Sequence, residues 1–376
     1  MEEYVENMKL LQRSILDFVE RKDNLEEDFQ NLTSLIQNQN ILKDPHEIKA
    51  LLYLILKISN NHNRSSDLFE KIEKILLFLK QEITQTFSNI DIFNIFKNNK
   101  KIIYFLIEQK ILTVDNSIYL KMMDPKYQKL DYPIFFSNYF KNTIEDSKIS
   151  DLLKDQPDNF EEKQKNCEND SKICEIIRND SVEEFISYTN QTNLSLTAKI
   201  ERSIFETNPF LLKNKPTLIE YAAFYGSIEI IKYLKSKNVD LSHSLWLYSI
   251  HSNKEELIHF LEENHVNPSD ESYEECMKEA IKCHHNEIAN YIKEKLLPKK
   301  ESAKEGEEPK ISRAMRQNIY SSAIRYYNYA FFENYFNNNL CFIRFCQYDY
   351  FKIVESTLKN NKMDVNYMVI SKKKIL

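Results

Sequence analysis

Side chains that can bind metal ions are densest between residues 251 and 285. This stretch holds Cys283, His284 and His285, together with His251, His259 and His265. Zinc sites place their ligands at defined spacings, such as two cysteines separated by two residues or two histidines separated by three. Adjacent residues on a helix point about 100° apart, so His284 and His285 cannot easily face the same ion. We expect no metal site and no cofactor in this chain.

Cysteine and glutamate side chains could instead supply a nucleophile or a general acid. The six cysteines, at positions 167, 174, 276, 283, 341 and 346, form no Cys-x-x-Cys motif, and we expect free thiols. Cys276 and Cys283 are seven residues apart, on one face of an expected helix, as small core residues are. Paired glutamates, such as those at 183–184 and 255–256, fall in expected first turns of helices, where they favour the helix dipole. No base or oxyanion motif accompanies them, so we expect no enzymatic activity.

Binding to nucleic acid or insertion into a membrane would need other patterns. The stretch from Tyr326 to Phe336 is rich in aromatic residues, but only Arg325 and Arg344 are near it, so packing between helices is expected. A net charge of −6 gives no electrostatic case for nucleic acid. The longest apolar run, residues 50–56, is far shorter than the roughly 18 residues that span a bilayer. The acidic N-terminus lacks the layout of a signal peptide, and we expect a cytoplasmic location.

Glycine is almost absent from the chain, which has 2 in 376 residues. Average usage near 7% would give about 26. Nucleotide-binding folds built on glycine-rich loops are thereby excluded, a turn-rich all-β chain is disfavoured, and the remaining class is all-α. Apolar residues at 4, 8, 11, 15 and 18, and again at 25, 29, 32 and 36, form a helical seam. The seam predicts either two helices packed into the core or a coiled-coil arm that dimerises.

Changes in composition predict five segments. Residues 1–140 form an N-terminal helical domain, in which Asp44 and the following proline begin a helix and residues 66–67 cap another. Residues 141–172 are acidic and are expected to be a mobile linker. Residues 173–297 carry repeats, 298–316 form a charged linker, and 317–376 form a further degenerate or truncated repeat whose end is expected to fray.

A small-residue pair, a turn residue and an apolar second helix recur along the chain. The best copy is centred on Gly226, and other copies place Asp180, Asn253, His284 and Asp349 at the same turn, with Asn98 as a looser analogue. Glycine and, next best, asparagine tolerate the left-handed conformation, so these residues are expected at tight turns between two short helices. No single pair can bury its apolar face alone, so neighbouring pairs must stack.

The segment from Thr217 to Asp240 resembles an ankyrin repeat. The residues that match the family pattern are Thr217, Ala222, Ala223, Gly226, Ile230, Ile231 and Leu234, followed by a closing Asn-Val-Asp. Leu218 and Glu220 replace the proline and histidine of the family's opening motif. The steps from 226 to 253 and from 253 to 284 are shorter than the family's roughly 33 residues, which puts long β-hairpin fingers in doubt. The chain is similar to divergent ankyrin proteins with an N-terminal helical region, a group expanded in some protozoa.

This resemblance implies an all-α, ankyrin-type solenoid that binds a protein partner without catalysis. In that family the loop tips and the surface of the first helices make the contacts. The corresponding partner-binding candidates are Tyr221, Phe224, Tyr225, Asn238, Asp240, His243, Trp246 and Tyr248. The aromatic residues among them could instead pack between repeats. The alternative function is a self-assembling structural protein, joined through the seam of residues 1–36 and an uncapped C-terminal repeat.

Overall fold

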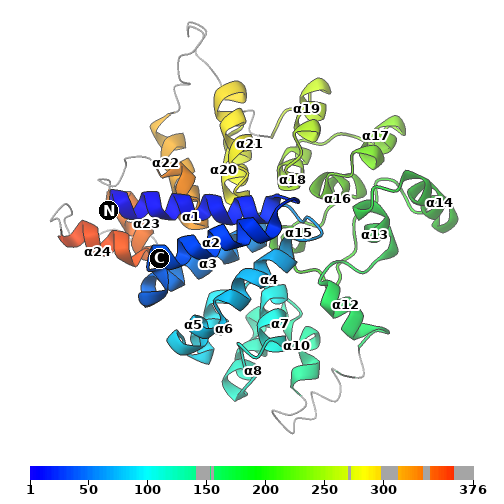
Figure 1. The fold of residues 1–376 in the computed structure, drawn as a ribbon. Helices are drawn as coiled ribbons and strands as arrows, with labels where there is room; N and C mark the ends of the chain where they lie inside the picture. The colour runs from blue at the N-terminus through cyan, green and yellow to red at the C-terminus, as the bar shows by residue number, and fades with distance from the viewer. Residues whose placement is uncertain (141–152, 154–155, 270–271, 298–311, 333–338, 360–376) are drawn as a thin grey trace, which may run out of the picture. The chain divides into compact units, whose positions relative to one another are not determined.

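The computed structural model describes residues 1–140, 153, 156–269, 272–297, 312–332 and 339–359. Within these ranges the chain is helical and has no β-strand; one isolated bridge pairs Lys199 with Thr217 (Figure 1). The expected all-α class is therefore confirmed, and long β-hairpin fingers do not occur in the described ranges. The contacts divide the chain into two compact units, one formed by Met1–Ile72 with Asn267–Leu376 and the other by Glu73–Val266.

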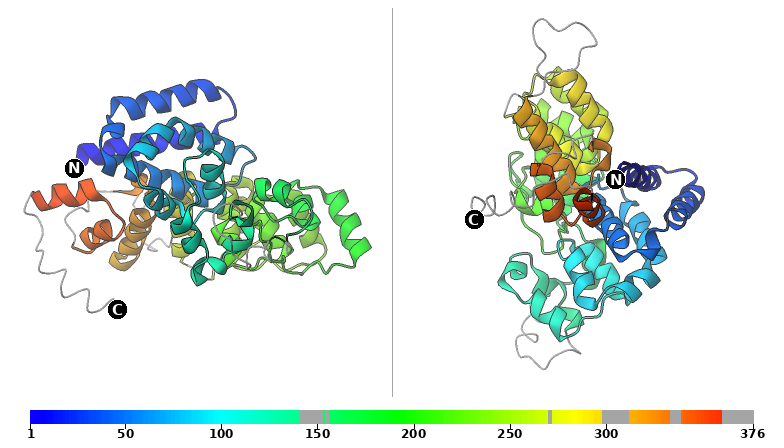
Figure 2. Two further views of the ribbon diagram at one scale, coloured as in Figure 1. Left: turned by 90° about the horizontal axis from the view of Figure 1, so that it is seen from below. Right: turned by 90° about the vertical axis from the view of Figure 1, so that its left-hand side faces the viewer.

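Unit 1 joins the first helices of the chain to its last helix pairs. Its elements are α1 (Glu2–Glu20), α2 (Leu25–Asn38), η1 (Ile41–Lys43), α3 (Pro45–Asn61), the start of α4 (Leu68–Phe78), α20 (Glu274–Cys283), α21 (Asn286–Tyr291), η3 (Ile292–Leu296), α22 (Arg313–Tyr326), η4 (Tyr329–Phe331), α23 (Asn339–Gln347) and α24 (Phe351–Lys359). Both views of Figure 2 place the red α24 near the N-terminal end of the chain, and the Thr357 hydroxyl donates to the Met1 sulfur at 3.7 Å.

Unit 2 contains the helices in the middle of the sequence. They are α5 (Lys80–Thr86), α6 (Asn89–Phe96), α7 (Lys100–Glu108), α8 (Asn116–Met122), α9 (Pro125–Gln128), α10 (Tyr132–Phe135), η2 (Ser137–Tyr139), α12 (Phe160–Asn166), α13 (Lys172–Arg178), α14 (Val182–Thr192), α15 (Pro209–Lys213), α16 (Leu218–Tyr225), α17 (Ile228–Ser236), α18 (Leu245–Ser252) and α19 (Glu255–Glu263). The expected N-terminal domain, residues 1–140, is thus shared between the two units.

Part of the expected acidic linker is structured. Residues 141–152 and 154–155 lie outside the described ranges, but α12 occupies 160–166 and is anchored by two buried side chains, Phe160 and Cys167, exposed by 5% and 0%. The acidic composition hid these two anchors, because they are few and far apart. Residues 298–311 of the charged linker and the C-terminal end, residues 360–376, also lie outside the described ranges.

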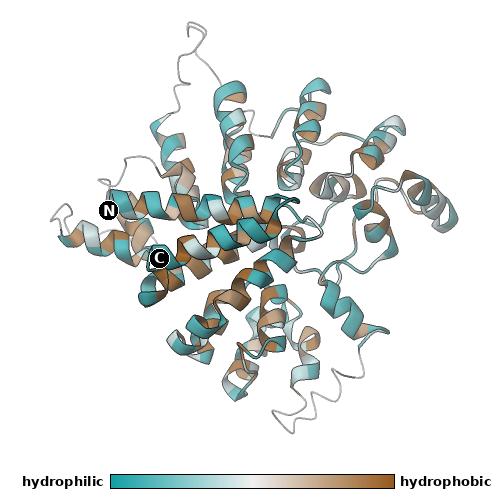
Figure 3. Ribbon diagram, viewed as in Figure 1, coloured by the Kyte–Doolittle hydropathy of each residue, from teal (hydrophilic) through white to brown (hydrophobic). Residues whose placement is uncertain are grey.

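Local sequence signals explain where several helices begin. The Asp44 carboxylate accepts the backbone N–H of His46 at 2.8 Å, with proline at the first helical position of α3, as expected. Thr217 and Glu220 form a reciprocal capping box at the start of α16. In Figure 3 hydrophobic and hydrophilic residues alternate along α1, and its seam positions Met8, Leu11 and Ile15 are buried.

The first helix of each pair ends at a residue in the left-handed conformation. The φ angles of the five expected turn residues are 71° at Gly226, 49° at Asp180, 54° at Asn253, 60° at His284 and 62° at Asp349. The prediction of these turns is confirmed. Glycine occupies only one of the five positions, because asparagine, aspartate and histidine tolerate this conformation better than most residues.

Two turn assignments need correction. Asn98 does not have a positive φ; instead the side chain of its neighbour Asn99 accepts the backbone N–H of Ile102 at 2.9 Å and caps α7. The sequence search also missed Tyr327, whose φ is 58° and which ends α22. An aromatic residue at a left-handed turn is rare, so residue type gave no signal there.

The residue after the turn makes the same backbone bond at five of these six turns, the exception being Lys254, whose N–H donates to the Ser252 hydroxyl oxygen. Ser227 donates its backbone N–H to Ala222 at 2.9 Å, His285 to Ala280 at 3.0 Å, and Asn328 to Ala323 at 3.0 Å, each five residues back. This is the Schellman arrangement, which satisfies carbonyls that the helix end would otherwise leave without a donor. Alanine at these acceptor positions leaves room for the second helix to turn back closely.

At three of these positions the side chain of that residue also links consecutive pairs. The Ser227 hydroxyl donates to the Ile177 carbonyl at 2.5 Å, the Asn328 amide to Ile281 at 2.9 Å, and the Tyr350 hydroxyl to Ile324 at 2.7 Å. In each case the acceptor lies three residues before the turn residue of the preceding pair. First helices accordingly pack in chain order, α13 with α16 and α16 with α18 in unit 2, and α20 with α22 and α22 with α23 in unit 1.

In unit 1, helix α3 runs along the turns of the last three pairs. Lys49 makes an ion pair with the turn residue Asp349 at 2.5 Å, and the ring of Tyr53 lies 5.5 Å from that of the turn residue Tyr327. At the end of the helix, His62 Nδ1 lies 3.0 Å from the carbonyl of Cys283, which precedes the third turn residue. Residues 49 and 53 are one helical turn apart, so one face of α3 meets successive turns.

A buried polar network ties α1 to the same turns. Gln12 Nε2 donates to Asn328 Oδ1 at 2.8 Å and lies 3.1 Å from His284 Nδ1, and Gln12 Oε1 accepts the backbone N–H of Ala330 at 3.3 Å. His284 Nε2 lies 3.0 Å from the carbonyl of Tyr326. Because Gln12 offers an N–H and Tyr326 a carbonyl oxygen, His284 is neutral, with its proton on Nε2.

Replacing Gly226 with valine should destabilise unit 2. A β-branched side chain is forced into positive φ, and its Cβ would lie 2.7 Å from Lys254 Cδ. The lysine chain can move aside, so the main loss is conformational, and we expect the free energy of unfolding to fall by about 1–2 kcal/mol. Gly226→Asn should lower the free energy of unfolding by less, since asparagine occupies the equivalent turn position at 253. Denaturant titration of both variants measures the difference, and equal stability of Gly226→Val and wild type would contradict it.

Acid should destabilise unit 1 through His284. Burial, with help from the neighbouring His62 and Lys57 side chains, lowers the pKa of His284 to about 3. The unfolded chain binds this proton near pH 6.5, so stability is full above that pH and falls as the pH drops towards 3. The slope from this group is about 1.4 kcal/mol per pH unit. Denaturant titrations between pH 7 and pH 4 measure it.

The matched control for His284 is His265. Both histidines have positive φ, but His265 is exposed while His284 is 1% exposed. His284→Asn keeps a residue suited to the turn and removes the titrating group, so it should flatten the pH dependence of stability. His265→Asn should leave that dependence as in wild type. Equal slopes in the two variants would show that another group carries the acid sensitivity.

Candidate interaction surfaces

Four of the eight expected partner-binding residues are buried and cannot anchor a partner. The exposed fractions are 1% for Tyr221, 1% for Phe224, 0% for Trp246 and 5% for Tyr248. The Trp246 indole donates to the carbonyl of Val266 at 2.5 Å. The prediction that these four aromatic residues lie on the first-helix surface is therefore wrong. They pack inside unit 2, which is the alternative that the sequence left open.

An aromatic cluster in unit 2 explains the burial of two of them. The ring of Phe210 stacks on Phe224 at 6.0 Å and meets the edge of Tyr248 at 4.9 Å. His251 lies 4.2 Å from Phe210 and 5.0 Å from Phe224. Phe210 comes from α15, a short helix between the pairs, so one inserted side chain fills the space against two successive first helices.

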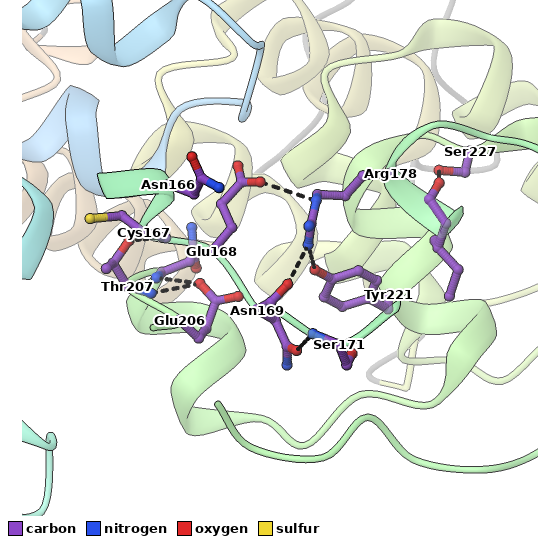
Figure 4. Close-up of polar contacts among 12 residues, drawn as sticks. Asn166, Cys167, Glu168, Asn169, Ser171, Arg178, Glu206, Thr207, Tyr221 and Ser227 are labelled. Carbon is purple, nitrogen blue, oxygen red and sulfur yellow. Dashed lines mark hydrogen bonds and ion pairs between the residues drawn. The ribbon is translucent and has the colours of Figure 1, made fainter. Parts of the chain in front are cut away.

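Tyr221 takes part in a second cluster, built around Arg178 (Figure 4). Arg178 Nη1 donates to the Tyr221 hydroxyl at 2.9 Å and to the carbonyl of Asn169 at 3.0 Å. Arg178 Nε lies 3.0 Å from the carboxylate of Glu168, and the guanidinium lies 5.9 Å from the centre of the Tyr225 ring. Burial raises the pKa of Tyr221, so its hydroxyl stays protonated. The guanidinium therefore has acceptors on several sides and holds the segment before α13 against α16.

The other four candidates remain available at the surface of unit 2. Asn238, Asp240 and His243 are exposed, and Tyr225 is half-buried. Asn238 has a φ of 60° and ends the second helix of its pair, so its residue type also serves the turn. The repeat-defining residues behave as structural residues: Ala222, Ala223 and Ile230 are 0% exposed, and Thr217 caps α16.

Three adjacent side chains with metal-binding or nucleophilic chemistry, those of residues 283–285, contact structural partners in unit 1. Both nitrogens of His284 are engaged, one with Gln12 and one with the carbonyl of Tyr326. His285 Nε2 accepts the backbone N–H of Asn63 at 3.3 Å. Burial raises the pKa of the Cys283 thiol, which disfavours the reactive thiolate.

A polar groove on the first helices of unit 1 escaped the sequence analysis. It has a volume of about 370 Å³, and its lining includes Lys282 of α20, Arg325 and Tyr326 of α22, Arg344 of α23, and Tyr348 in the turn that follows α23. The sequence places Tyr326 in a stretch expected to pack between helices, with Arg325 only a neighbour of that stretch. The groove was missed because the turn at Tyr327 was missed. Arg325 lies two residues before Tyr327, just as Lys282 lies two residues before the turn residue His284, so the two cations occupy equivalent positions on successive first helices.

Comparisons with protein-family models, with curated proteins and with solved structures find no match to this chain. Its function must therefore be argued from its own surfaces. In the described ranges, no helix combines the length and the apolar character needed to cross a membrane.

Removing the Arg178 side chain should destabilise unit 2 strongly. The side chain is 17% exposed, and Arg178→Gln would leave Glu168 without its cation and Tyr221 without its donor. Loss of one partner of a largely buried pair lowers the free energy of unfolding by about 3 kcal/mol. Arg202→Gln is the matched control, since Arg202 pairs with Asp131 at 2.7 Å but is 48% exposed. It should lose less than about 1 kcal/mol. Thermal or denaturant unfolding of both variants decides, and similar losses would contradict a structural role for Arg178.

Proposed function

We propose that this chain is a non-catalytic, ankyrin-type repeat scaffold that binds a protein partner through its first-helix surfaces and loop tips. The observation that carries the proposal is a bond that occurs at three of the steps between consecutive pairs, from the residue after one turn to the carbonyl three residues before the preceding turn. A contact repeated at one register is the signature of units that stack on one another.

The best repeat supports the ankyrin assignment in detail. Its capping threonine, its buried alanine pair, and its left-handed glycine occupy the roles that the family pattern gives them. The bridge between Lys199 and Thr217, with the Leu218 N–H donating to Ala198 at 3.1 Å, pairs extended segments just before the first helix. A finger of ankyrin type, shortened to its base, would leave such a pairing.

The surface left open on this repeat suits recognition of a partner. Asp240 and His243 lie in the connection from α17 to α18 and are exposed. Exposed polar residues in a connection held by two packed helices can bind without disturbing the core. The second helix presents a different surface, with Glu229 and Lys232 joined in an exposed ion pair at 2.8 Å.

The apolar seam of residues 1–36 does not support the self-assembly alternative. The seam residues Leu11, Ile15, Leu32 and Ile36 are all 0% exposed within the chain itself. α1 packs against α2 and η4 in unit 1, so the seam favours the interpretation as core helices over a coiled-coil arm. The other half of that alternative depends on residues 360–376, which lie outside the described ranges.

Proximity labelling and affinity capture with the full chain test the scaffold proposal. Wild type should recover a specific partner, and changing Asp240 and His243 together to alanine should lower its recovery several-fold. Changing Glu229 and Lys232 to alanine is the matched control on the second helix and should have no effect. Recovery of no partner, or only of further copies of this chain, would contradict the proposal.

A further inference from the structure

The groove on α20, α22 and α23 concentrates positive charge around one aromatic ring. The Tyr326 ring has Lys57 Nζ at 5.9 Å from its centre, Lys282 Nζ at 5.9 Å and the Arg325 guanidinium at 5.4 Å. All of these residues belong to unit 1. Each cation alone is attracted to the face of the ring, but three cations around one ring also repel each other.

Among the described residues, one of these three cations has a carboxylate partner. Lys282 pairs with Glu279 at 2.6 Å. Neither Lys57 nor Arg325 makes an ion pair with any of the described residues. Burial lowers the pKa of Lys57 to about 8, and the nearby charge of Arg325 contributes in the same direction.

The remaining lining residues add to the imbalance. Lys278 is paired with Glu275, so the two glutamates of the lining neutralise the two lysines. Arg325 and Arg344 are left in excess, and both are exposed. Arg344 makes a hydrogen bond with the neutral Gln347 at 2.8 Å. A chain with a net charge of −6 thus carries a local site of opposite sign.

We propose that this groove binds an acidic segment of a partner protein, with Arg325 and Arg344 holding its carboxylates and Tyr326 and Tyr348 contacting its chain. The proposal rests on the partner-binding function proposed above and names the chemistry of the partner. Guanidinium groups match carboxylates because two parallel N–H donors can meet the two oxygens. A carboxylate bound to Arg325 would also offset the repulsion between Arg325 and Lys57.

The dimensions and charge of the groove favour a peptide over a nucleic acid. A phosphate backbone needs a long basic track, whereas the positive excess here is confined to about 370 Å³. Glu275 and Glu279, each paired with a lysine, interrupt the basic surface that successive phosphates would need. Carboxylates spaced along a flexible peptide can reach the two arginines and avoid both glutamates.

Fluorescence anisotropy with the full chain tests the proposal directly. The probes are a labelled peptide of roughly ten residues that alternates glutamate and serine, the same peptide with glutamine in place of glutamate, and a uridine oligonucleotide of similar length. The glutamate peptide should bind at least about tenfold more tightly than the glutamine peptide, which corresponds to about 1.4 kcal/mol, and its affinity should fall as salt is raised. Equal affinity for the two peptides, or tighter binding of the oligonucleotide, would overturn the proposal.

Two double variants on the same unit locate the binding. Changing Arg325 and Arg344 to glutamine should weaken the glutamate peptide by about tenfold or more. Changing Arg313 and Arg316 to glutamine removes the same charge from exposed positions of α22 outside the groove and should have little effect. Matching thermal unfolding of both variants and wild type shows that they are folded. If both double variants lose the same affinity for the glutamate peptide, net charge alone explains the effect, and the assignment of binding to the groove is overturned.

The proposal of an acidic ligand for the groove and the scaffold proposal can be tested separately. If affinity capture recovers the same partner with wild type and with the Arg325 and Arg344 double variant, the acidic-segment proposal is overturned and the scaffold proposal stands. If the glutamate peptide binds the groove but capture recovers no partner, the scaffold proposal fails while the site chemistry holds.

Discussion

The left-handed residue at the end of each first helix is the constraint on which this structure depends. Helices as short as eight to ten residues are not stable alone, so each pair must reverse tightly and bury its face against the next. A single residue with positive φ makes that reversal, and at Ser227, Asn328 and Tyr350 the residue after it closes the helix with its backbone and bonds to the preceding pair with its side chain. At these three pairs, two adjacent positions therefore carry both the turn and a bond of the stack.

In unit 1 the same turns also serve as the docking site for the N-terminal helices. Asp349 and Tyr327 project towards α3, and His284 receives Gln12 from α1. This accounts for the joining of residues 1–72 with the last pairs of the chain rather than with the helices that follow them in sequence. A neutral buried imidazole suits this place because it can accept from one amide and donate to a carbonyl, whereas a protonated one would meet the Gln12 donor with a second N–H.

The sequence was most informative where local chemistry decides the structure. The turns at Asp180, Gly226 and Asn253 could be predicted because few residue types tolerate positive φ and the flanking apolar pattern marks the register. Tyr327 could not, because tertiary packing of its ring overrides a poor local preference. The exposure of side chains could not be predicted either. The sequence pattern around Trp246 is the same for a buried and for an exposed tryptophan, and neighbouring elements of the fold bury it. The division into units follows from long-range contacts, which periodicity does not contain.

The position two residues before the turn shows how one residue type acquires different roles. Arg178 and Arg325 both occupy it, on the first helices of their pairs. The segment before α13 supplies Glu168 and the carbonyl of Asn169 to Arg178, and α16 supplies Tyr221, so that its charge is satisfied internally. Arg325 has the ring of Tyr326 but no carboxylate among the described residues. The same register therefore gives a structural core in one unit and a site open to an acidic ligand in the other, and the difference lies in what the neighbouring segments supply.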